Sequence, residues 1–164
     1  MINFITATKN DFPLMANIAK SVWHETFDPL IGNDQVEYML EKFQSVSAFL
    51  RQTTTEGYTY YLIVDESGTQ GYIALCNDKS DRLFMSKLYL LPSARGKGYA
   101  RKALEMASQK AVELNKRAVY LTVNKGNARA IAVYEKCGFT RIDSVKADIG
   151  NGFFMDDFVY EKQV

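Results

Sequence analysis

The sequence predicts a single α/β domain over residues 1–164, with a mixed central sheet of about seven strands and four or five helices. The chain has 164 residues, 47% of them hydrophobic, which suffices for one domain with its own core. Strand-like and helix-like segments follow one another without a linker, repeat or low-complexity stretch. One strand-like segment passes through a glycine-rich turn into a helix, which predicts a parallel pair of strands around that helix.

The first helix is predicted from signals at both of its ends. Thr8, with Asp11 three residues later, indicates a helix start. Apolar residues at helical spacing then continue to about Phe27. We expect Pro29 and Gly32 to end this helix, because both residues disfavour a continued helical ladder.

The remaining elements follow from two periodicities, alternate apolar residues for strands and apolar residues every three or four positions for helices. The predicted strands are residues 2–7, 58–65, 71–77, 82–91, 118–123, 140–147 and 153–161. The further predicted helices are residues 34–43, 46–53, 98–114 and 127–136. The segment Glu66–Thr69 is a turn signal that joins two of these strands in a hairpin.

The segment Leu88–Arg101 carries the strongest functional signal. Its strand stops at Pro92, and a tight glycine turn then leads into a helix. Unpaired backbone N–H groups at a helix N-terminus form a site for phosphate. Gly96 and Gly98 lack a Cβ, so a diphosphate can approach the backbone closely.

Two common phosphate loops are excluded by the letters of this segment. A nucleoside-triphosphate loop needs G-x-x-x-x-G-K-[ST], which does not occur. A dinucleotide loop needs a third glycine where Arg101 stands, and an acidic residue about 20 positions further on, where the chain reads Lys116–Tyr120. The pattern that remains is R-x-x-G-x-A, from Arg95 to Ala100.

That pattern resembles the acyl-CoA loop of the GNAT superfamily of N-acetyltransferases. A second segment, Asn124–Phe139, resembles the N-x-x-N…Y-x-x-x-G-F segment of the same family and follows a predicted strand, as it does there. The order of elements around both motifs matches the family over nearly all of the chain. The resemblance implies acetyl-CoA as co-substrate and a parallel pair of strands that splays at the acetyl-CoA cleft, so that the pantetheine arm adds in like an extra strand.

The resemblance also assigns residues to the cofactor. Backbone groups of Leu88 and Leu90 are expected to pair with the pantetheine amides, and the Asn127 amide to bind the same arm. Lys136 and Arg129 are candidates for the ribose phosphate. The residues expected around the pyrophosphate are Arg95, Gly96, Lys97, Gly98, Tyr99, Ala100 and Arg101.

Tyr134 is the candidate proton donor. It lies seven residues after Asn127, which places both on one face of the predicted helix. Acyl transfer releases CoA as a thiolate that needs a proton, and a phenol in a dry cleft supplies one. A core tyrosine with a satisfied hydroxyl is the structural alternative, and the motif around Tyr134 favours the catalytic role.

The general base is not obvious, although a protonated amine must lose a proton before it attacks. Many GNAT enzymes carry a glutamate on the strand before the loop, but here that strand reads Phe84–Lys87 and has no carboxylate. The candidates that remain are His24, Glu25, the pair Asp156–Asp157 and a water relay. His24 is the only histidine and has a suitable intrinsic pKa, with a surface position as the alternative.

The charge of the chain is unevenly distributed, although its net value is only +1. Residues 92–136 contain ten Lys and Arg against three Glu, which suits a cofactor with several phosphates. Residues 1–56 contain seven acidic and four basic residues, which favours a cationic acceptor unless these acids merely solvate helix faces. The acids that dominate there are Glu25, Asp28, Asp34, Glu37 and Glu41.

The acceptor class is suggested by a narrower resemblance. The segments Trp23–Phe27 and Ile149–Asp157 resemble the bacterial spermidine/spermine N-acetyltransferase branch. We therefore expect an enzyme that moves acetyl from acetyl-CoA to a primary amine, such as a polyamine, by direct attack in a ternary complex. The alternatives are a peptide or protein amine, an aminoglycoside or an amino acid as acceptor, and a CoA-binding module without turnover.

Other partner classes are not expected. The low net charge argues against a nucleic-acid binder, and no apolar run approaches the length of a membrane span. The sequence has no metal-ligand pattern and no signal segment, so we expect cytoplasmic residence with Cys76 and Cys137 as reduced thiols. A homodimer is compatible with the sequence, which leaves the oligomeric state open.

Overall fold

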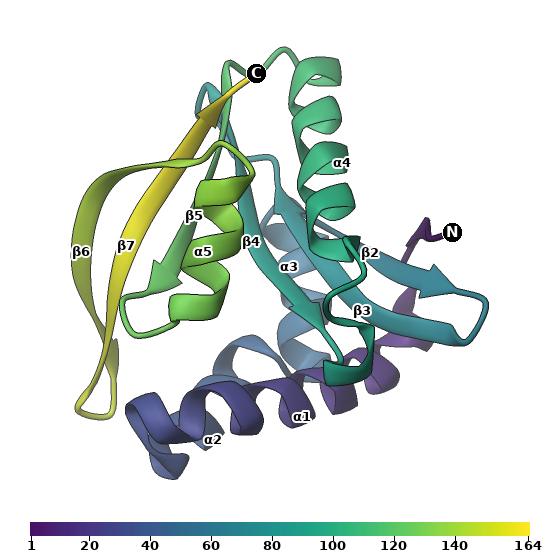
Figure 1. Cartoon of the computed structure of the whole chain (residues 1–164). Helices are drawn as coiled ribbons and strands as arrows, with labels where there is room; N and C mark the ends of the chain where they lie inside the picture. Colours follow the sequence, from purple (N-terminus) through teal and green to yellow (C-terminus); the bar gives the residue numbers. More distant parts are fainter.

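The computed structural model describes residues 1–164 and shows one twisted sheet with helices on both faces (Figure 1). The seven strands have the order β1-β2-β3-β4-β5-β7-β6, and β4 and β5 form the parallel pair. The strands are β1 (Asn3–Thr6), β2 (Tyr58–Asp65), β3 (Gly68–Cys76), β4 (Arg82–Leu90), β5 (Ala118–Asn124), β6 (Thr140–Gly150) and β7 (Phe153–Gln163). The helices are α1 (Phe12–Ile31), α2 (Asn33–Phe43), α3 (Val46–Thr55), α4 (Tyr99–Glu113) and α5 (Ala128–Lys136). The predicted fold class is confirmed.

Helix α1 is longer than the sequence predicts. Pro29 lies inside it and does not end it. Proline removes a single N–H from the helical ladder, and the N–H of Gly32 still donates to the Asp28 carbonyl at 3.0 Å. The helix ends at Gly32, whose φ of 85° is a conformation that glycine adopts without strain.

Two hairpins are also longer than predicted, because their turns are tighter. The turn between β2 and β3 narrows to two residues, and β3 begins at Gly68. The turn between β6 and β7 consists of Asn151 and Gly152, with φ values of 54° and 79°. Positive φ at both central residues is typical of the Asn-Gly hairpin turn, which lets each strand of this hairpin run for 11 residues.

The parallel pair splays because β4 contains a bulge. Ala74 of β3 pairs with Lys87, and Leu75 pairs with Met85, so Ser86 is an extra residue in β4. β4 and β5 are in register only over residues 82–84 of β4. Beyond them the strands diverge toward the end of the sheet that α1 crosses (Figure 1), and the β5-facing edge of β4 has no strand partner.

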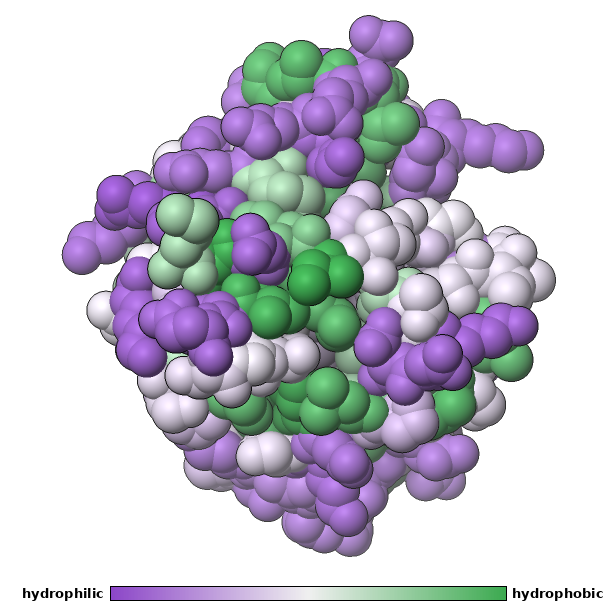
Figure 2. Space-filling model, turned by 90° about the vertical axis from the view of Figure 1, so that its right-hand side faces the viewer, coloured by the Kyte–Doolittle hydropathy of each residue, from purple (hydrophilic) through white to green (hydrophobic).

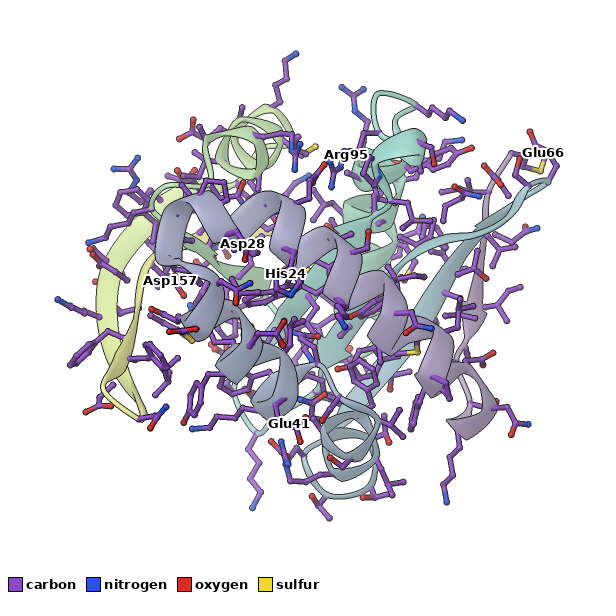
Figure 3. All side chains as sticks on the ribbon, turned by 90° about the horizontal axis from the view of Figure 1, so that it is seen from below. His24, Asp28, Glu41, Glu66, Arg95 and Asp157 are labelled. Carbon is purple, nitrogen blue, oxygen red and sulfur yellow. The ribbon has the colours of Figure 1, made fainter.

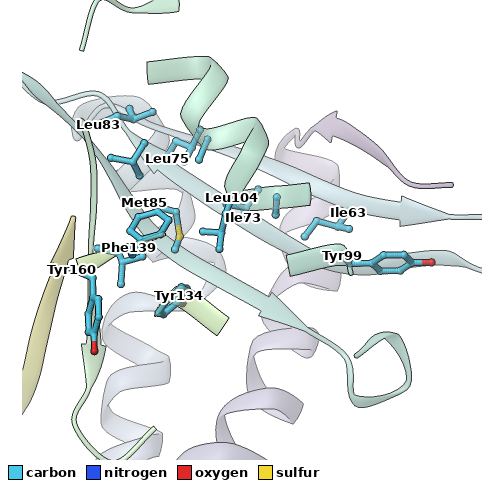
Figure 4. Packing of buried hydrophobic residues seen from close by; sticks show 14 of the residues in the cluster. Ile63, Ile73, Leu75, Leu83, Met85, Tyr99, Leu104, Tyr134, Phe139 and Tyr160 are labelled. Carbon is cyan, nitrogen blue, oxygen red and sulfur yellow. The ribbon is translucent and has the colours of Figure 1, made fainter. Parts of the chain in front are cut away.

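The core lies in two layers, one on each face of the sheet. A cluster of 18 buried residues joins the sheet to α4 and α5, and a cluster of 15 joins it to α1, α2 and α3. Figure 4 shows the first cluster, in which Ile73, Leu75 and Met85 of the sheet lie near Leu104 of α4 and Tyr134 of α5. Packing on both faces holds the diverging strands in place.

On the face seen in Figure 2, hydrophobic residues gather near the centre within a hydrophilic border. None of the helices combines the length and the apolar character that crossing a bilayer takes. Cys76 is buried and Cys137 half-buried, and the two thiols are free, as predicted.

Candidate active site

A cavity of about 450 Å³ lies where β4 and β5 separate. Hydrophobic residues make up 19 of the 33 that line it, so its walls offer a ligand mainly apolar contacts. All of the residues predicted to contact the cofactor line this cavity except Lys97. Tyr134 lines it as well, whereas His24 and Glu25 do not.

The glycine turn before α4 has an open backbone. Gly96 and Gly98 have φ values of 77° and 80°, and a Cβ added at either would meet nothing within 4 Å. The first N–H bonded back into the helix is that of Lys102, which donates to the Gly98 carbonyl at 3.2 Å. The N–H groups before it are therefore free for an anion. The Tyr99 hydroxyl donates to Asp65 at 2.8 Å and fastens the start of α4 to β2.

Glu25 of α1 forms ion pairs across the mouth of the cavity. Its carboxylate accepts from Arg95 of the glycine turn at 2.8 Å and lies 3.7 Å from Arg129 of α5. The hydrogen bond from Arg95 lowers the pKa of this carboxyl. Glu25 therefore lies beside Arg95 and Arg129, which the sequence assigns to the cofactor phosphates, and not beside Tyr134.

The free edge of β4 provides the backbone groups predicted for the pantetheine arm. Leu88 and Leu90 lie on this edge beyond the bulge and line the cavity, while their side chains pack against the core under α4. An extended arm with two amides fits beside such an edge as a further strand does.

Tyr134 is a buried residue whose hydroxyl is accessible from the cavity. The residue is 8% exposed, and burial raises its pKa to about 12, so the phenol keeps its proton at neutral pH. Asn127 caps the same helix, because its Oδ1 accepts from the Ala130 N–H at 3.3 Å. The side-chain NH₂ of Asn127 has no partner in the protein, which leaves a donor for the arm.

His24 is committed to the contact between α1 and α2. Its Nδ1 lies 2.9 Å from Asp28 and its Nε2 lies 2.7 Å from Glu37, and the pKa of the imidazole is raised chiefly by the hydrogen bond with Asp28. Figure 3 shows His24 and Asp28 on α1. Because both ring nitrogens face carboxylates, the ring has no free lone pair for an amine proton. The structure therefore does not bring His24 together with Tyr134.

Lys87 stands on the strand where many relatives were expected to carry a glutamate. Its ammonium is buried and donates to the Phe43 carbonyl at 2.6 Å, to Gln52 at 3.1 Å and to the Tyr60 hydroxyl at 2.6 Å. Burial lowers its pKa well below the usual range. These contacts tie the bulged part of β4 to α2, α3 and β2, so Lys87 supports the cavity wall.

Asp157 of β7 is the carboxylate that does line the cavity. It is 6% exposed, makes no hydrogen bond or ion pair, and has a pKa raised to about 6 by burial. Its neighbour Asp156 instead binds Lys125 at 2.8 Å outside the cavity. The sequence offers both aspartates as base candidates, and the structure separates them.

The end of the cavity away from the glycine turn is apolar. The acids expected to attract a cationic acceptor, Asp28, Asp34, Glu37 and Glu41, do not line it. Instead α1 presents Trp23, Phe27 and Ile31, and β7 presents Met155. Trp23, Phe27 and Ile31 follow one another at intervals of four residues, so the sequence itself indicates that they share one face of the helix.

Comparison with known sequences agrees with this geometry. The profile of the Acetyltransferase (GNAT) family matches residues 19–139. The curated protein "Uncharacterized N-acetyltransferase YjgM" of Escherichia coli (strain K12) is 37% identical over 90 residues. That alignment covers 53% of this chain and 54% of the relative, so the chain spans about half the length of the curated protein it matches.

Solved structures share the fold at low identity. The PaiA N-acetyltransferase of Thermoplasma acidophilum, in complex with coenzyme A, has a TM-score of 0.83 at 19% identity, over 100% of this chain and 99% of that one. A spermidine N-acetyltransferase of Vibrio cholerae, in complex with CoA and spermine, has a TM-score of 0.70 at 17% identity, over 99% and 95%. The family profile covers most of the chain, including the glycine turn and α5, and the chain therefore belongs to the acetyltransferase (GNAT) family.

Proposed function

We propose that this protein is an acetyl-CoA-dependent N-acetyltransferase that transfers the acetyl group to a primary amine within a ternary complex. The observation that carries the proposal is the meeting of three features in one cavity. These are the unpaired edge of β4, the free N–H groups of the glycine turn and the hydroxyl of Tyr134. The first two suit a peptide-like arm that ends in a diphosphate, and the third suits a thiolate leaving group.

The cofactor is held mainly by main chain. The N–H groups from Gly96 to Arg101 bind the diphosphate, with the side chains of Arg101 and Lys136 lining the same cavity. The pantetheine amides pair with the backbone of Leu88 and Leu90, and the Asn127 amide supports the arm. In this arrangement Glu25 positions Arg95 through their ion pair and takes no part in the chemistry.

The chemistry needs three proton movements. The ammonium loses one proton, and its nitrogen lone pair attacks the thioester carbonyl. The tetrahedral intermediate collapses as the C–S bond breaks, the sulfur takes a proton from Tyr134, and the nitrogen releases a second proton that restores the phenol. The net products are the acetamide, CoA as free thiol and one proton. Tyr134 suits the donor role because its raised pKa keeps the hydroxyl protonated until sulfur departs.

A polyamine is one acceptor that this proposal includes. It is supported by the shared fold with the spermidine N-acetyltransferase, whereas the acids of residues 1–56 do not line the cavity. A CoA-binding module without turnover is the candidate from another class. The absence of a carboxylate on residues 84–87 favours it, and the Tyr134 hydroxyl in the cavity argues against it.

The proposal is tested by acetyl-CoA binding and by thiol release. Calorimetry should detect acetyl-CoA binding, and a screen of polyamines, amino acids, peptides and aminoglycosides should find amines that release CoA. Gly98→Ala should weaken acetyl-CoA binding about tenfold, because a Cβ there keeps a diphosphate from the backbone. Gly152→Ala is the matched control, since its φ of 79° is close to the 80° of Gly98 and it too has no neighbour within 4 Å.

Two results would count against the proposal. No heat of binding with acetyl-CoA would remove the assignment of the cavity. Equal weakening by Gly98→Ala and Gly152→Ala would show that backbone strain, and not the diphosphate site, explains the loss.

A further inference from the structure

The part of the cavity that the cofactor leaves free differs from a site for a polycation. Its walls come from α1, α2 and β7, and its polar uncharged side chains are Thr26 and Gln35. Gln35 is already engaged, because its Nε2 donates to the Phe154 carbonyl at 2.6 Å. The apolar side chains of this part are Val22, Phe27, Ile31, Met39, Phe154 and Met155, and Trp23 adds an indole whose buried Nε1–H has no partner in the protein.

Asp157 is the single negative charge on these walls. It is 6% exposed and has no hydrogen-bond or ion-pair partner in the protein, and its carboxylate oxygens are accessible from the cavity. Lys125 does not serve as its partner, because the Lys125 ammonium forms an ion pair with the neighbouring Asp156. An ammonium group from a ligand would supply the missing partner.

No further carboxylate is placed to meet a second or third positive charge on the acceptor. Glu25 is paired with Arg95 and Arg129, while Asp28 and Glu37 are paired with His24. The rings of Trp23 and Phe27 lie 4.5 Å apart and form an apolar wall instead. A distal ammonium against that wall would lose its water and gain contact with the ring faces but no counter-charge.

We propose that the acceptor is a primary amine with one positive charge on an apolar aliphatic or aromatic body. Its ammonium lies against Asp157 and its body against Trp23, Phe27 and Met155. Asp157 also takes the first proton, so that the carboxylate becomes a carboxylic acid as the ammonium becomes a neutral amine. This inference rests on the proposed acetyltransferase activity and narrows its acceptor class.

A matched pair of amines tests the inference directly. Heptylamine and hexane-1,6-diamine have chains of the same length, and the diamine carries a second ammonium where the monoamine has a methyl group. With acetyl-CoA and wild-type protein, kcat/KM for thiol release should be at least about tenfold higher for heptylamine. Phenethylamine should be accepted, and spermidine should be poorer than heptylamine.

Three variants test the charge on the cavity wall separately from the folding of the protein. Asp157→Asn should lower kcat/KM for heptylamine about 100-fold and leave acetyl-CoA binding unchanged, while Asp156→Asn should stay close to wild type. Met155→Glu places a second carboxylate on the wall and should shift the ratio of rates toward the diamine. Circular dichroism shows whether each variant is folded.

Equal or faster turnover of the diamine would overturn the inference, as would an Asp157→Asn protein with wild-type kcat/KM. Turnover of neither amine by protein that binds acetyl-CoA would also overturn it. If acetyl-CoA does not bind at all, the proposed function itself fails, and calorimetry on the wild-type protein distinguishes that case.

Discussion

Burial acts on Tyr134 and Asp157 through the same physical effect and suits them to the opposite roles that we propose for them. Removal from water disfavours the charged form of each group, so both pKa values rise, to about 12 for the phenol and about 6 for the carboxyl. The phenol thereby remains a proton donor at neutral pH. The carboxylate remains ionised there and becomes a stronger proton acceptor than an exposed aspartate.

We predict that Tyr134→Phe lowers kcat about 100-fold without unfolding the protein. The hydroxyl has no hydrogen-bond partner in the protein, so its removal leaves no buried group unsatisfied. Steady-state thiol release and thermal melting provide the two measurements, and acetyl-CoA affinity should be that of wild type. A wild-type kcat in this variant would remove the donor role.

The acid limb of the pH–rate profile should belong to Asp157. The pKa of its carboxyl is raised to about 6. Below that pH the carboxylate is protonated and can no longer accept a proton, so kcat/KM should fall. The profile of Asp157→Asn should lose this limb, and that of Asp156→Asn should keep it. The same limb in all three proteins would assign it to another group.

Asp157 should also make the protein less stable at neutral pH. Between pH 3.8 and about 6 the folded protein holds a proton that the unfolded chain has released, so the free energy of unfolding falls as pH rises. Asp157→Asn should therefore gain stability over wild type, by up to about 3 kcal/mol at pH 7. Urea unfolding at pH 4.5 and 7 measures the free energy of unfolding of both proteins. An equal difference between them at the two pH values would contradict the prediction.

At the scale of elements, the bulge at Ser86 shapes the site. It turns the side chains of Lys87 and Tyr89 toward α1, α2 and α3, and those of Leu88 and Leu90 toward the core under α4. The free edge of β4 follows from this one extra residue. The contacts of Lys87 with the Phe43 carbonyl and the Tyr60 hydroxyl then hold the bulged strand against the other layer.

The link between α1 and α2 should depend on pH through His24. Its carboxylate partners raise the pKa of the imidazole, so its contribution to stability is complete below about 6.5 and is lost as pH rises through the raised value. His24→Gln should lower the Tm more at pH 6 than at pH 8.5. Lys20→Gln, on the exposed face of the same helix, is the control and should show no such difference.

At the scale of the whole molecule, β6 is a long edge without a partner. It is the last strand of the sheet, and Ile142 and Val145 on it are 50% and 39% exposed. Exposed edges of this length pair readily with another chain. The hairpin of β6 and β7 also forms one wall of the acceptor end, through Met155 and Asp157.

We therefore expect a homodimer that pairs through β6. Sedimentation velocity of the wild-type protein should show a dimer, and Ile142→Lys should shift it toward the monomer by placing charge on that edge. Leu114→Lys is the control, because Leu114 is similarly exposed (43%) but lies at the C-terminal end of α4 and not on β6. A wild-type monomer at all concentrations would contradict the expectation.

Much of this protein is encoded in short stretches of its chain. The periodicity of apolar residues predicts every helix and strand of the sheet, and Gly96 and Gly98 predict the open turn, since both adopt positive φ. Conformations of this kind depend on the nearest residues, so a linear reading recovers them. For the same reason the sequence locates the loop that we propose to bind the diphosphate.

The direction of individual side chains depends instead on packing between elements distant in the sequence. Asp156 and Asp157 are neighbours, yet one pairs with Lys125 and the other lines the cavity. His24 lies beside the apolar Trp23, but contact with Glu37 of α2 takes its ring away from the cavity. The position of β7 between β5 and β6 and the approach of α2 to α1 settle these placements, because burial and ion pairing act between groups that only the folded chain brings together.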